Sequence, residues 1–291
     1  MNSSSRTAQY MALFRTIESA RSLKQRLFND PLAFEFLTPS LRVPAVLARF
    51  PPFGEAISLM IDLRWKGART SGIARTRYID DCLKKALRNG YKQLLLLGAG
   101  FDSRAYRINE LKSIPVIEVD HPSTSRHKQR LLEHSLGKLP SNVHFLEIDF
   151  NKQNLREALQ GISCDRSLPT VIIWEGVTNY LTAEGVERTF QSLLYFQRCL
   201  LIFTYIDKAV LEPEVKSRQT ASVKARLSKV DENWTFGFDP PRLPAFLSSH
   251  GFRLLEDIAA NEYRLLYLPP RKRFLQGYAF YRIAVAETAF R

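Results

Sequence analysis

Cysteines and long hydrophobic runs are both scarce in this 291-residue chain. The three cysteines, Cys82, Cys164 and Cys199, lie far apart, without a C-x-x-C pair or a histidine at metal-ligand spacing. The sequence therefore offers neither a disulfide framework nor a zinc site, and we predict no bound metal. Apolar runs such as residues 94–97 are too short to span a bilayer, and the polar residues 1–15 do not resemble a secretion signal. We expect a cytoplasmic, soluble protein without a membrane partner.

Acidic residues are also few: 29 Asp and Glu stand against 42 Lys and Arg, which gives a net charge of +13. Such a charge favours an anionic substrate, a nucleic acid or a membrane surface as a partner, without choosing among them. The basic residues are spread over several stretches, residues 64–77, 126–138, 216–229 and 271–273. This spread favours an ordinary solvated surface, so a nucleic-acid partner stays open but is not favoured.

The order of the expected elements indicates an α/β fold. Residues 1–74 contain short helical stretches interrupted by prolines, which predict a helical cap or lid. The expected strands are residues 93–97, 116–119, 143–148, 171–174, 200–203, 252–258 and 278–287. Their alternation with helical stretches predicts a doubly wound, seven-stranded sheet. Residues 75–291 would form this core, with a lid insertion at about residues 207–244 that contains a basic surface helix over residues 214–230.

The turn after the first expected strand carries the clearest chemical signal. Its sequence is GAGFDSR, beginning at Gly98. Gly98 and Gly100 allow a sharp turn and a close approach of the backbone to a ligand. Asp102 directly precedes the position at which a dinucleotide-binding motif has its third glycine, and we expect it to cap the next helix and pair with Arg104. A carboxylate there repels a pyrophosphate but tolerates the sulfonium and ammonium of S-adenosylmethionine, which disfavours a dehydrogenase.

Three further acids follow later strands. Asp120 lies 22 residues after Gly98, where an acid normally binds ribose hydroxyls. Asp149 could accept from an adenine amino group while Phe150 covers the ring, although a single Asp after a strand is also a common helix cap. Glu175 would lie at the carboxyl edge of the sheet, where α/β proteins place ligand groups. Together these residues predict a site for an adenosine-containing ligand.

In this order, the motifs resemble those of the leucine carboxyl methyltransferase family, especially its bacterial branch of small-molecule methyltransferases. The shared segments are ESAR (18–21), LFNDP (27–31), ARTRYID (74–80), GAGFDSRAYR (98–107), EVDHP (118–122), DF (149–150) and EGVTNYL (175–181). The resemblance implies a class I methyltransferase fold, a Rossmann-like seven-stranded sheet with an N-terminal helical cap, and S-adenosyl-L-methionine as the cofactor.

The resemblance also implies roles for single residues. Arg75 would hold the carboxylate of the cofactor, and Gly98 would form the turn against its methionine part. Asp120 would bind the ribose, and Glu175 would lie near the amino group. The full expected cofactor set is Arg75, Gly98, Gly100, Asp120, Asp149, Phe150 and Glu175.

We therefore expect an O-methyltransferase that modifies a hydroxyl or carboxyl oxygen of a small molecule. A tRNA or protein carboxyl methyltransferase and a cofactor-binding protein without turnover are the alternatives. A carboxylate acceptor needs no base, whereas a phenol or alcohol does. The candidates for a general base are His121, Tyr180 and Tyr205. The candidates for acceptor binding are Tyr10, Arg21, Tyr205, Lys208 and Trp234.

Overall fold

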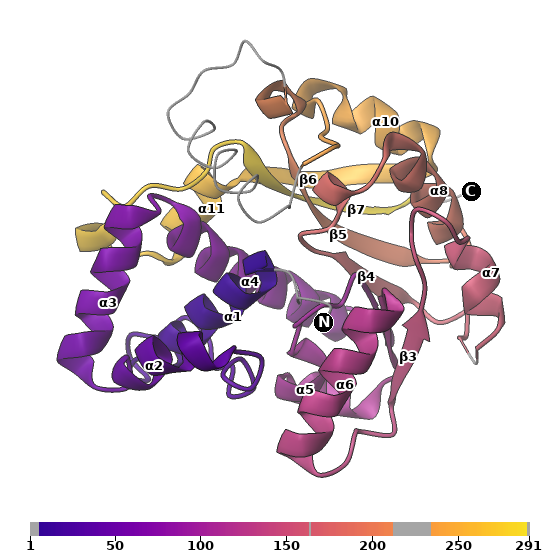
Figure 1. Ribbon diagram of the computed structural model, residues 1–291. Coiled ribbons are helices and arrows are strands. Elements are labelled where there is room, and N and C mark those ends of the chain that lie inside the picture. Colours follow the sequence, from indigo (N-terminus) through magenta and orange to yellow (C-terminus); the bar gives the residue numbers. More distant parts are fainter. Residues whose placement is uncertain (1–5, 163, 212–233, 290–291) are drawn as a thin grey trace.

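A seven-stranded sheet forms the centre of the molecule in this computed structural model, which describes residues 6–162, 164–211 and 234–289 (Figure 1). The strands are β1 (Gln93–Leu97), β2 (Val116–Asp120), β3 (Val143–Glu147), β4 (Thr170–Trp174), β5 (Cys199–Ile206), β6 (Phe252–Ala259) and β7 (Tyr281–Thr288). Their order is β3-β2-β1-β4-β5-β7-β6. The first five strands are parallel, and β7 is antiparallel to both of its neighbours. The predicted seven-stranded, doubly wound sheet is confirmed.

Helices cover both faces of the sheet, because side chains along each strand alternate between two hydrophobic clusters. Leu95 and Leu97 of β1 point to the face packed by α7 (Leu155–Gln160), α8 (Ala183–Leu193) and α10 (Leu243–Ser249). Leu94 and Leu96 point to the opposite face, packed by α4 (Ala68–Arg88), α5 (Arg104–Arg107) and α11 (Ala260–Tyr267). The helix α6 (Pro122–Leu136) lies beside β2 and β3. Buried on both faces, the central strands position their carboxyl ends rigidly.

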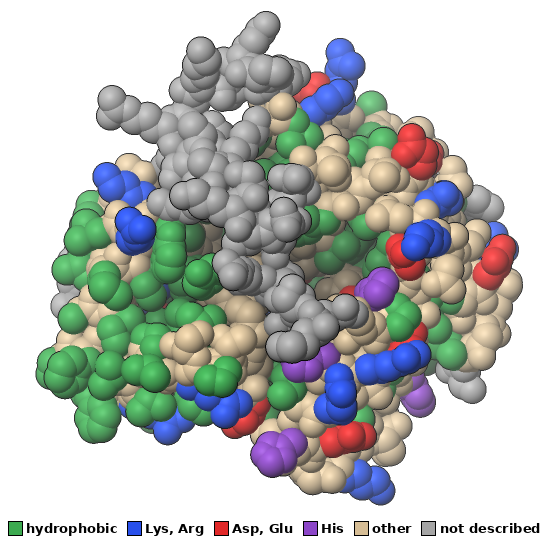
Figure 2. Space-filling view, in the orientation of Figure 1, with side chains coloured by type: hydrophobic (Ala, Val, Ile, Leu, Met, Phe, Trp, Pro, Cys, Tyr) green, Lys and Arg blue, Asp and Glu red, His purple; other side chains and the backbone are tan. Residues whose placement is uncertain are grey.

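The N-terminal helices form a third cluster beside the sheet (Figure 1). These cap helices are α1 (Arg6–Ser19), α2 (Pro39–Leu47) and α3 (Pro51–Arg64). The predicted boundary at residue 74 falls inside α4, a continuous helix. Ile73 of α4 packs in the cap cluster, whereas Ala74 and Ile79 pack against the sheet. Many outward-facing side chains of the cap are hydrophobic (Figure 2).

The structure describes two parts of the predicted insertion 207–244, namely residues 207–211 and 234–244. These two parts meet next to β5. Asp207 forms an isolated bridge with Phe238, and the Lys208 N–H donates to the Phe238 carbonyl at 2.8 Å. The predicted surface helix over residues 214–230 lies outside the described residues. Within the described ranges, every helix is too short or too polar to cross a bilayer.

Candidate functional site

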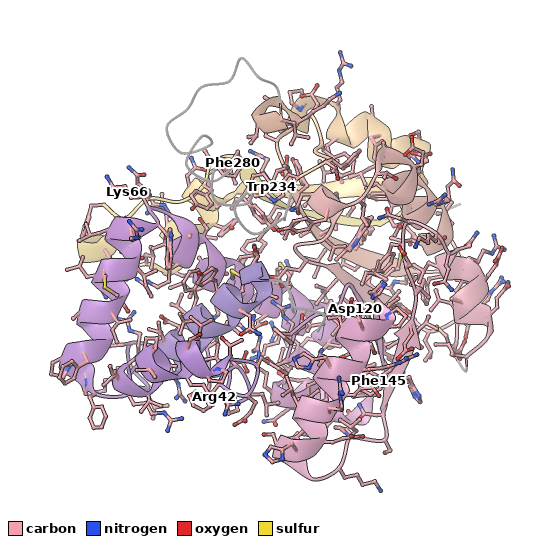
Figure 3. All side chains as sticks on the ribbon, viewed as in Figure 1. Arg42, Lys66, Asp120, Phe145, Trp234 and Phe280 are labelled. Carbon is pink, nitrogen blue, oxygen red and sulfur yellow. The ribbon has the colours of Figure 1, made fainter. Side chains whose placement is uncertain are left out.

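A cavity of about 550 Å³ lies at the carboxyl ends of β1, β2 and β4, between the sheet and the cap. Its walls come from distant parts of the chain: α1, α4, the glycine turn after β1, the segments after β2, β3 and β4, Trp234 in the insertion, and Tyr278 and Tyr281 around the start of β7. Figure 3 labels two wall residues, Asp120 at the end of β2 and Trp234 in the insertion. This is the edge at which open α/β sheets bind ligands.

The glycine turn closes the cavity from the sheet side. Gly98 has a φ of +65°, a conformation that favours glycine. A Cβ atom at this position would lie 2.3 Å from a methyl carbon of Val177, so no larger residue fits without movement. Gly100 also has a positive φ, of +40°, and its N–H donates to the Asp120 carboxylate. The predicted sharp turn is therefore present and lies directly against the cavity.

The Asp120 carboxylate is fixed by the backbone around it. One oxygen accepts from Gly100, and the other accepts from the His121 N–H at 2.6 Å. Burial raises the pKa of Asp120, and these two backbone donors only partly offset the effect. The side chain thus lies at the cavity wall with its orientation set before any ligand binds.

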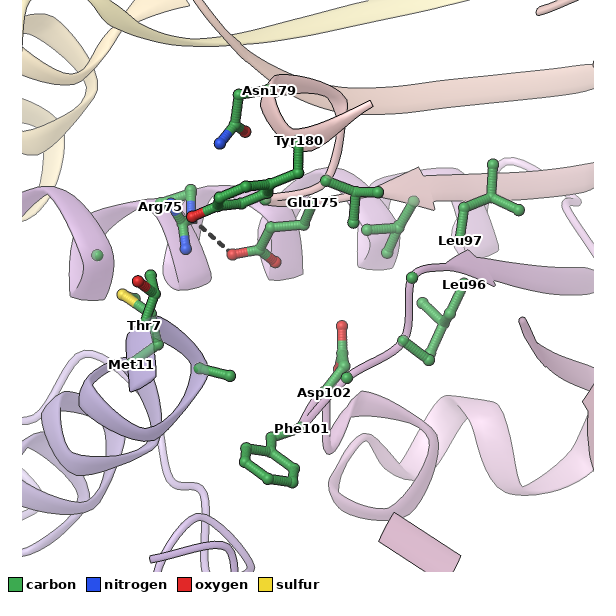
Figure 4. A pocket seen from close by; sticks show the side chains of 18 of the residues that line it. Thr7, Met11, Arg75, Leu96, Leu97, Phe101, Asp102, Glu175, Asn179 and Tyr180 are labelled. Atoms are coloured by element: carbon green, nitrogen blue, oxygen red, sulfur yellow. Dashed lines mark hydrogen bonds and ion pairs between the residues drawn. The ribbon is translucent and has the colours of Figure 1, made fainter. Parts of the chain in front are cut away.

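Glu175 connects α4 and α5 at the cavity, because it pairs with an arginine from each helix. Its carboxylate accepts from Arg75 Nε at 2.6 Å (Figure 4). It also accepts from Arg104 Nη1 at 2.7 Å. Burial alone would raise the pKa of Glu175, but the charges of Arg104 and Arg75 outweigh it and lower the pKa to about 2. Glu175 is therefore an anion at neutral pH. The Arg75 guanidinium also lies over the Tyr281 ring, 5.0 Å from its centroid.

Arg104 is a central residue of the site to which the sequence analysis assigned no ligand role. Its side chain contacts Asp102, Glu175 and Asp80, with its Nε 2.8 Å from Asp80 Oδ1. The expected pairing with Asp102 is present, and Asp102 also accepts from the Arg104 N–H, at the start of α5, at 2.8 Å. Arg104 thus connects α4, the glycine turn and the end of β4.

A second buried network joins the cap to the glycine turn. Asp30, which is only 1% exposed, accepts from Arg15 Nε at 2.8 Å and from Ser103 Oγ at 2.7 Å. Arg15 also donates to the Phe101 carbonyl at 2.7 Å. The sequence contained a signal for this network, because the LFNDP and GAGFDSRAYR segments were both singled out. Their mutual contact could not be inferred from spacing.

The other two expected cofactor residues, Asp149 and Phe150, also line the cavity. Asp149 accepts from the Asn151 N–H at 3.0 Å, so part of its carboxylate serves the local turn. The fold therefore brings all seven residues of the expected cofactor set to one cavity.

The base candidates divide into two groups. His121 and Tyr180 line the cavity. Tyr205 does not, which corrects its assignment as a base and as an acceptor contact. Its ring is buried in the cluster on the α8 face, and its hydroxyl donates to Asp257 at 2.8 Å and accepts from Arg282 at 3.0 Å. Because side chains alternate along β5, Tyr205 points into the core.

The acceptor candidates also divide. Tyr10 and Trp234 line the cavity, and the Tyr10 ring lies 5.1 Å from that of Trp65, a wall residue that the sequence analysis missed. Arg21 and Lys208 are not on the wall. Arg21 pairs with Glu18 and Glu55 on the cap instead, and Lys208 is exposed next to β5. The further aromatic wall residues that sequence reasoning missed are Phe14, Phe101, Tyr278 and Tyr281.

Comparison with known sequences identifies the family. The sequence profile of the leucine carboxyl methyltransferase family matches residues 8–194. The chain belongs to this family. The match includes the cap and the sheet through β4 and α8, and thus all seven expected cofactor residues. The family assignment made from the motifs is confirmed.

Two curated bacterial proteins are similar to this chain. Both are provisionally named S-adenosyl-L-methionine-dependent methyltransferases. The one from Frankia alni is 34% identical over 181 residues, which are 62% of this chain and 60% of that protein. The one from Streptomyces coelicolor is 31% identical over 181 residues, 62% of this chain and 61% of that protein. The chain thus spans about 60% of the length of these relatives.

Solved structures share the fold. A crystal structure described as a methyltransferase from Thermobifida fusca has a TM-score of 0.56 at 17% identity, covering 89% of this chain and 97% of that one. A DUF574 family protein from Streptomyces avermitilis has a TM-score of 0.55 at 12% identity, covering 94% and 96%. The class I methyltransferase fold expected from the sequence is confirmed.

Proposed function

We propose that this protein transfers a methyl group from S-adenosyl-L-methionine to a hydroxyl or carboxyl oxygen of a small molecule. One observation carries the proposal: the Gly98 turn, the fixed Asp120 carboxylate and the anionic Glu175 beside Arg75 lie on one cavity wall. The family assignment and the names of the relatives support the same cofactor.

The wall residues fit this cofactor chemically. Gly98 leaves the space that a Cβ would fill, so the backbone can lie against a ligand. Glu175, with its lowered pKa, complements an ammonium group. Arg75 contacts Glu175 through Nε, and its terminal amino groups carry further N–H donors that suit a carboxylate. Asp120 would accept from the ribose hydroxyls, and Asp149 and Phe150 would hold the adenine.

When bound, S-adenosyl-L-methionine supplies a methyl group on a sulfonium, which is already activated for attack. The protein then has to hold an acceptor oxygen close to that group and exclude water. The aromatic wall formed by Tyr10, Trp65 and Trp234 supports a small organic acceptor, and we propose that the cap and the insertion cover it. A hydroxyl acceptor would use His121 or Tyr180 as its base.

The net charge of +13 is compatible with the nucleic-acid alternative, but the distribution of the basic residues does not favour it. On the face shown in Figure 2, the Lys and Arg side chains are scattered over the surface. A continuous basic stripe would be expected for RNA binding.

Calorimetric titration with S-adenosyl-L-methionine and S-adenosylhomocysteine, with NAD as a control, tests the proposal. We expect saturable binding of the first two only. Asp120→Asn should weaken that binding by at least about tenfold, because it removes a charged acceptor. Glu147→Gln is the matched control, since Glu147 pairs with Arg126 on the surface and does not line the cavity.

Two outcomes would count against the proposal. Unchanged affinity in folded Asp120→Asn protein would show that the assigned wall residues do not hold the cofactor. Normal cofactor binding without transfer of a labelled methyl group to any hydroxyl or carboxyl compound in a broad panel would favour a binding protein instead.

A further inference from the structure

The outer face of the cap carries a concentrated apolar surface, which we call the cap patch. It consists of Val43, Val46, Leu47, Phe50, Phe53, Leu59, Met60 and Leu63. These are eight of the fifteen large hydrophobic residues that the described part of the chain exposes, yet they lie within 21 consecutive positions. Figure 2 shows the hydrophobic side chains gathered over α2 and α3. A surface of this kind marks an interaction site rather than scattered exposed residues.

The helix geometry makes the cap patch a continuous face. At about 100° per residue, Phe53, Leu59, Met60 and Leu63 fall within an arc of roughly 120° on α3. The three exposed apolar residues of α2 also share one side of their helix, and Phe50 lies between the two helices in sequence. All eight side chains are between 41% and 65% exposed, so the cap cluster does not bury them.

Basic residues accompany the cap patch. Arg42, Arg49, Arg64 and Lys66 belong to the same helices and their ends, and Figure 3 shows Arg42 and Lys66 at opposite ends of the cap. Arg42 has an acid nearby, since its Nη2 lies 4.0 Å from Glu35 Oε2. The two acids within residues 39–66 pair with other cations. Asp62 pairs with buried Arg69, and Glu55 pairs with Arg21 and Lys272. The apolar face therefore has a basic border.

We infer that the cap patch docks onto the surface of an anionic lipid bilayer. Apolar side chains that enter the interface, together with basic residues that face anionic headgroups, are the two contributions that hold surface-lying helices on membranes. A second copy of the chain is a poorer partner, because self-association would bring two basic borders together. Docking requires no spanning helix. The proposal departs from the sequence-based expectation of no membrane partner.

The inference does not depend on the proposed function, because none of the eight residues lines the cavity. It is tested by sedimenting the full chain with vesicles of phosphatidylcholine alone or with 30% phosphatidylglycerol. We expect binding to the anionic vesicles that weakens as salt rises. The variant Phe53→Ser/Met60→Ser/Leu63→Ser should bind at least about tenfold more weakly. Arg49→Glu/Lys66→Glu should lose binding to the anionic vesicles by a similar factor.

A matched control is Leu136→Ser/Leu255→Ser, which removes two comparably exposed leucines outside the cap and should leave vesicle binding unchanged. Circular dichroism melts establish that each variant is folded. Failure of the wild-type chain to bind anionic vesicles at low salt would overturn the inference. A wild-type dimer that the triple serine variant converts to a monomer would also overturn it, because the cap patch would then be a self-association surface.

Discussion

The substitution Glu175→Gln tests the ion-pair network at the cavity most directly. It removes one negative charge and keeps the size of the side chain. Arg75 would lose the carboxylate that its Nε contacts at 2.6 Å, whereas Arg104 would keep Asp80 and Asp102. Both arginine side chains are at most 11% exposed, so water compensates poorly for the lost charge.

The expected loss of stability follows from the pKa of Glu175. Lowering a pKa from 4.5 to about 2 corresponds to about 3 kcal/mol of stability at neutral pH. Breaking a buried ion pair costs a similar amount. Because the folded-state pKa is the lower one, this contribution is present above pH 4.5 and is lost as the pH falls through about 2.

Differential scanning calorimetry at pH 7 provides the measurement. For a chain of 291 residues, 3 kcal/mol lowers the melting temperature by roughly 5 °C. Glu147→Gln, which breaks the exposed pair with Arg126, should change the melting temperature by less than about 2 °C. If Glu175→Gln melts as the wild type does, the arginines do not depend on this carboxylate and our reasoning about the site is wrong.

Three further substitutions test the glycine turn, the contact of the cap with that turn, and the part of the cavity where we propose that the acceptor binds. Gly98→Ala should destabilise the protein by about 1–3 kcal/mol and abolish cofactor binding, and adding Val177→Ala should restore part of both in melting and calorimetric measurements. Asp30→Ala should lower the free energy of unfolding in urea by about 3 kcal/mol, because Arg15, whose side chain is only 12% exposed, loses its ion-pair partner. No change would show that the cap–turn network is dispensable. Once an acceptor is found, Trp234→Ala should raise its KM by roughly tenfold, whereas Lys208→Ala should keep it within about twofold in steady-state assays.

Much of the sheet could be predicted because its signals are local. Residues 94–97 form a continuous apolar run, and the predicted strand 93–97 has the same bounds as β1 in the structure. The other expected strands differ from the observed ones by a few residues at their ends, where pairing with neighbours decides the length. The two glycines at positions 98 and 100 likewise have the positive φ angles that their motif indicated.

The site was only partly predictable, because its partners come from distant segments. Asp120 and Glu175 could be placed at the sheet edge from their positions after strands. The role of Arg104 in joining Asp80 to Glu175 depends on how α4 packs against the sheet, which no spacing reveals. Tyr205 was assigned to the site for its position near the end of a strand, but that position does not fix the face to which a side chain points.

The continuity of α4 has a consequence for engineering the family. Hybrids that exchange caps between relatives cannot be joined at residue 74, because the junction would interrupt a helix that packs on the cap and on the sheet at once. The short connection between α3 and α4 is the better junction. There Gly67 has a φ of +91° and the helical hydrogen bonding begins anew at Ala68. A transplanted cap would then bring its own residue at position 65 and leave Arg75 in the register of the recipient.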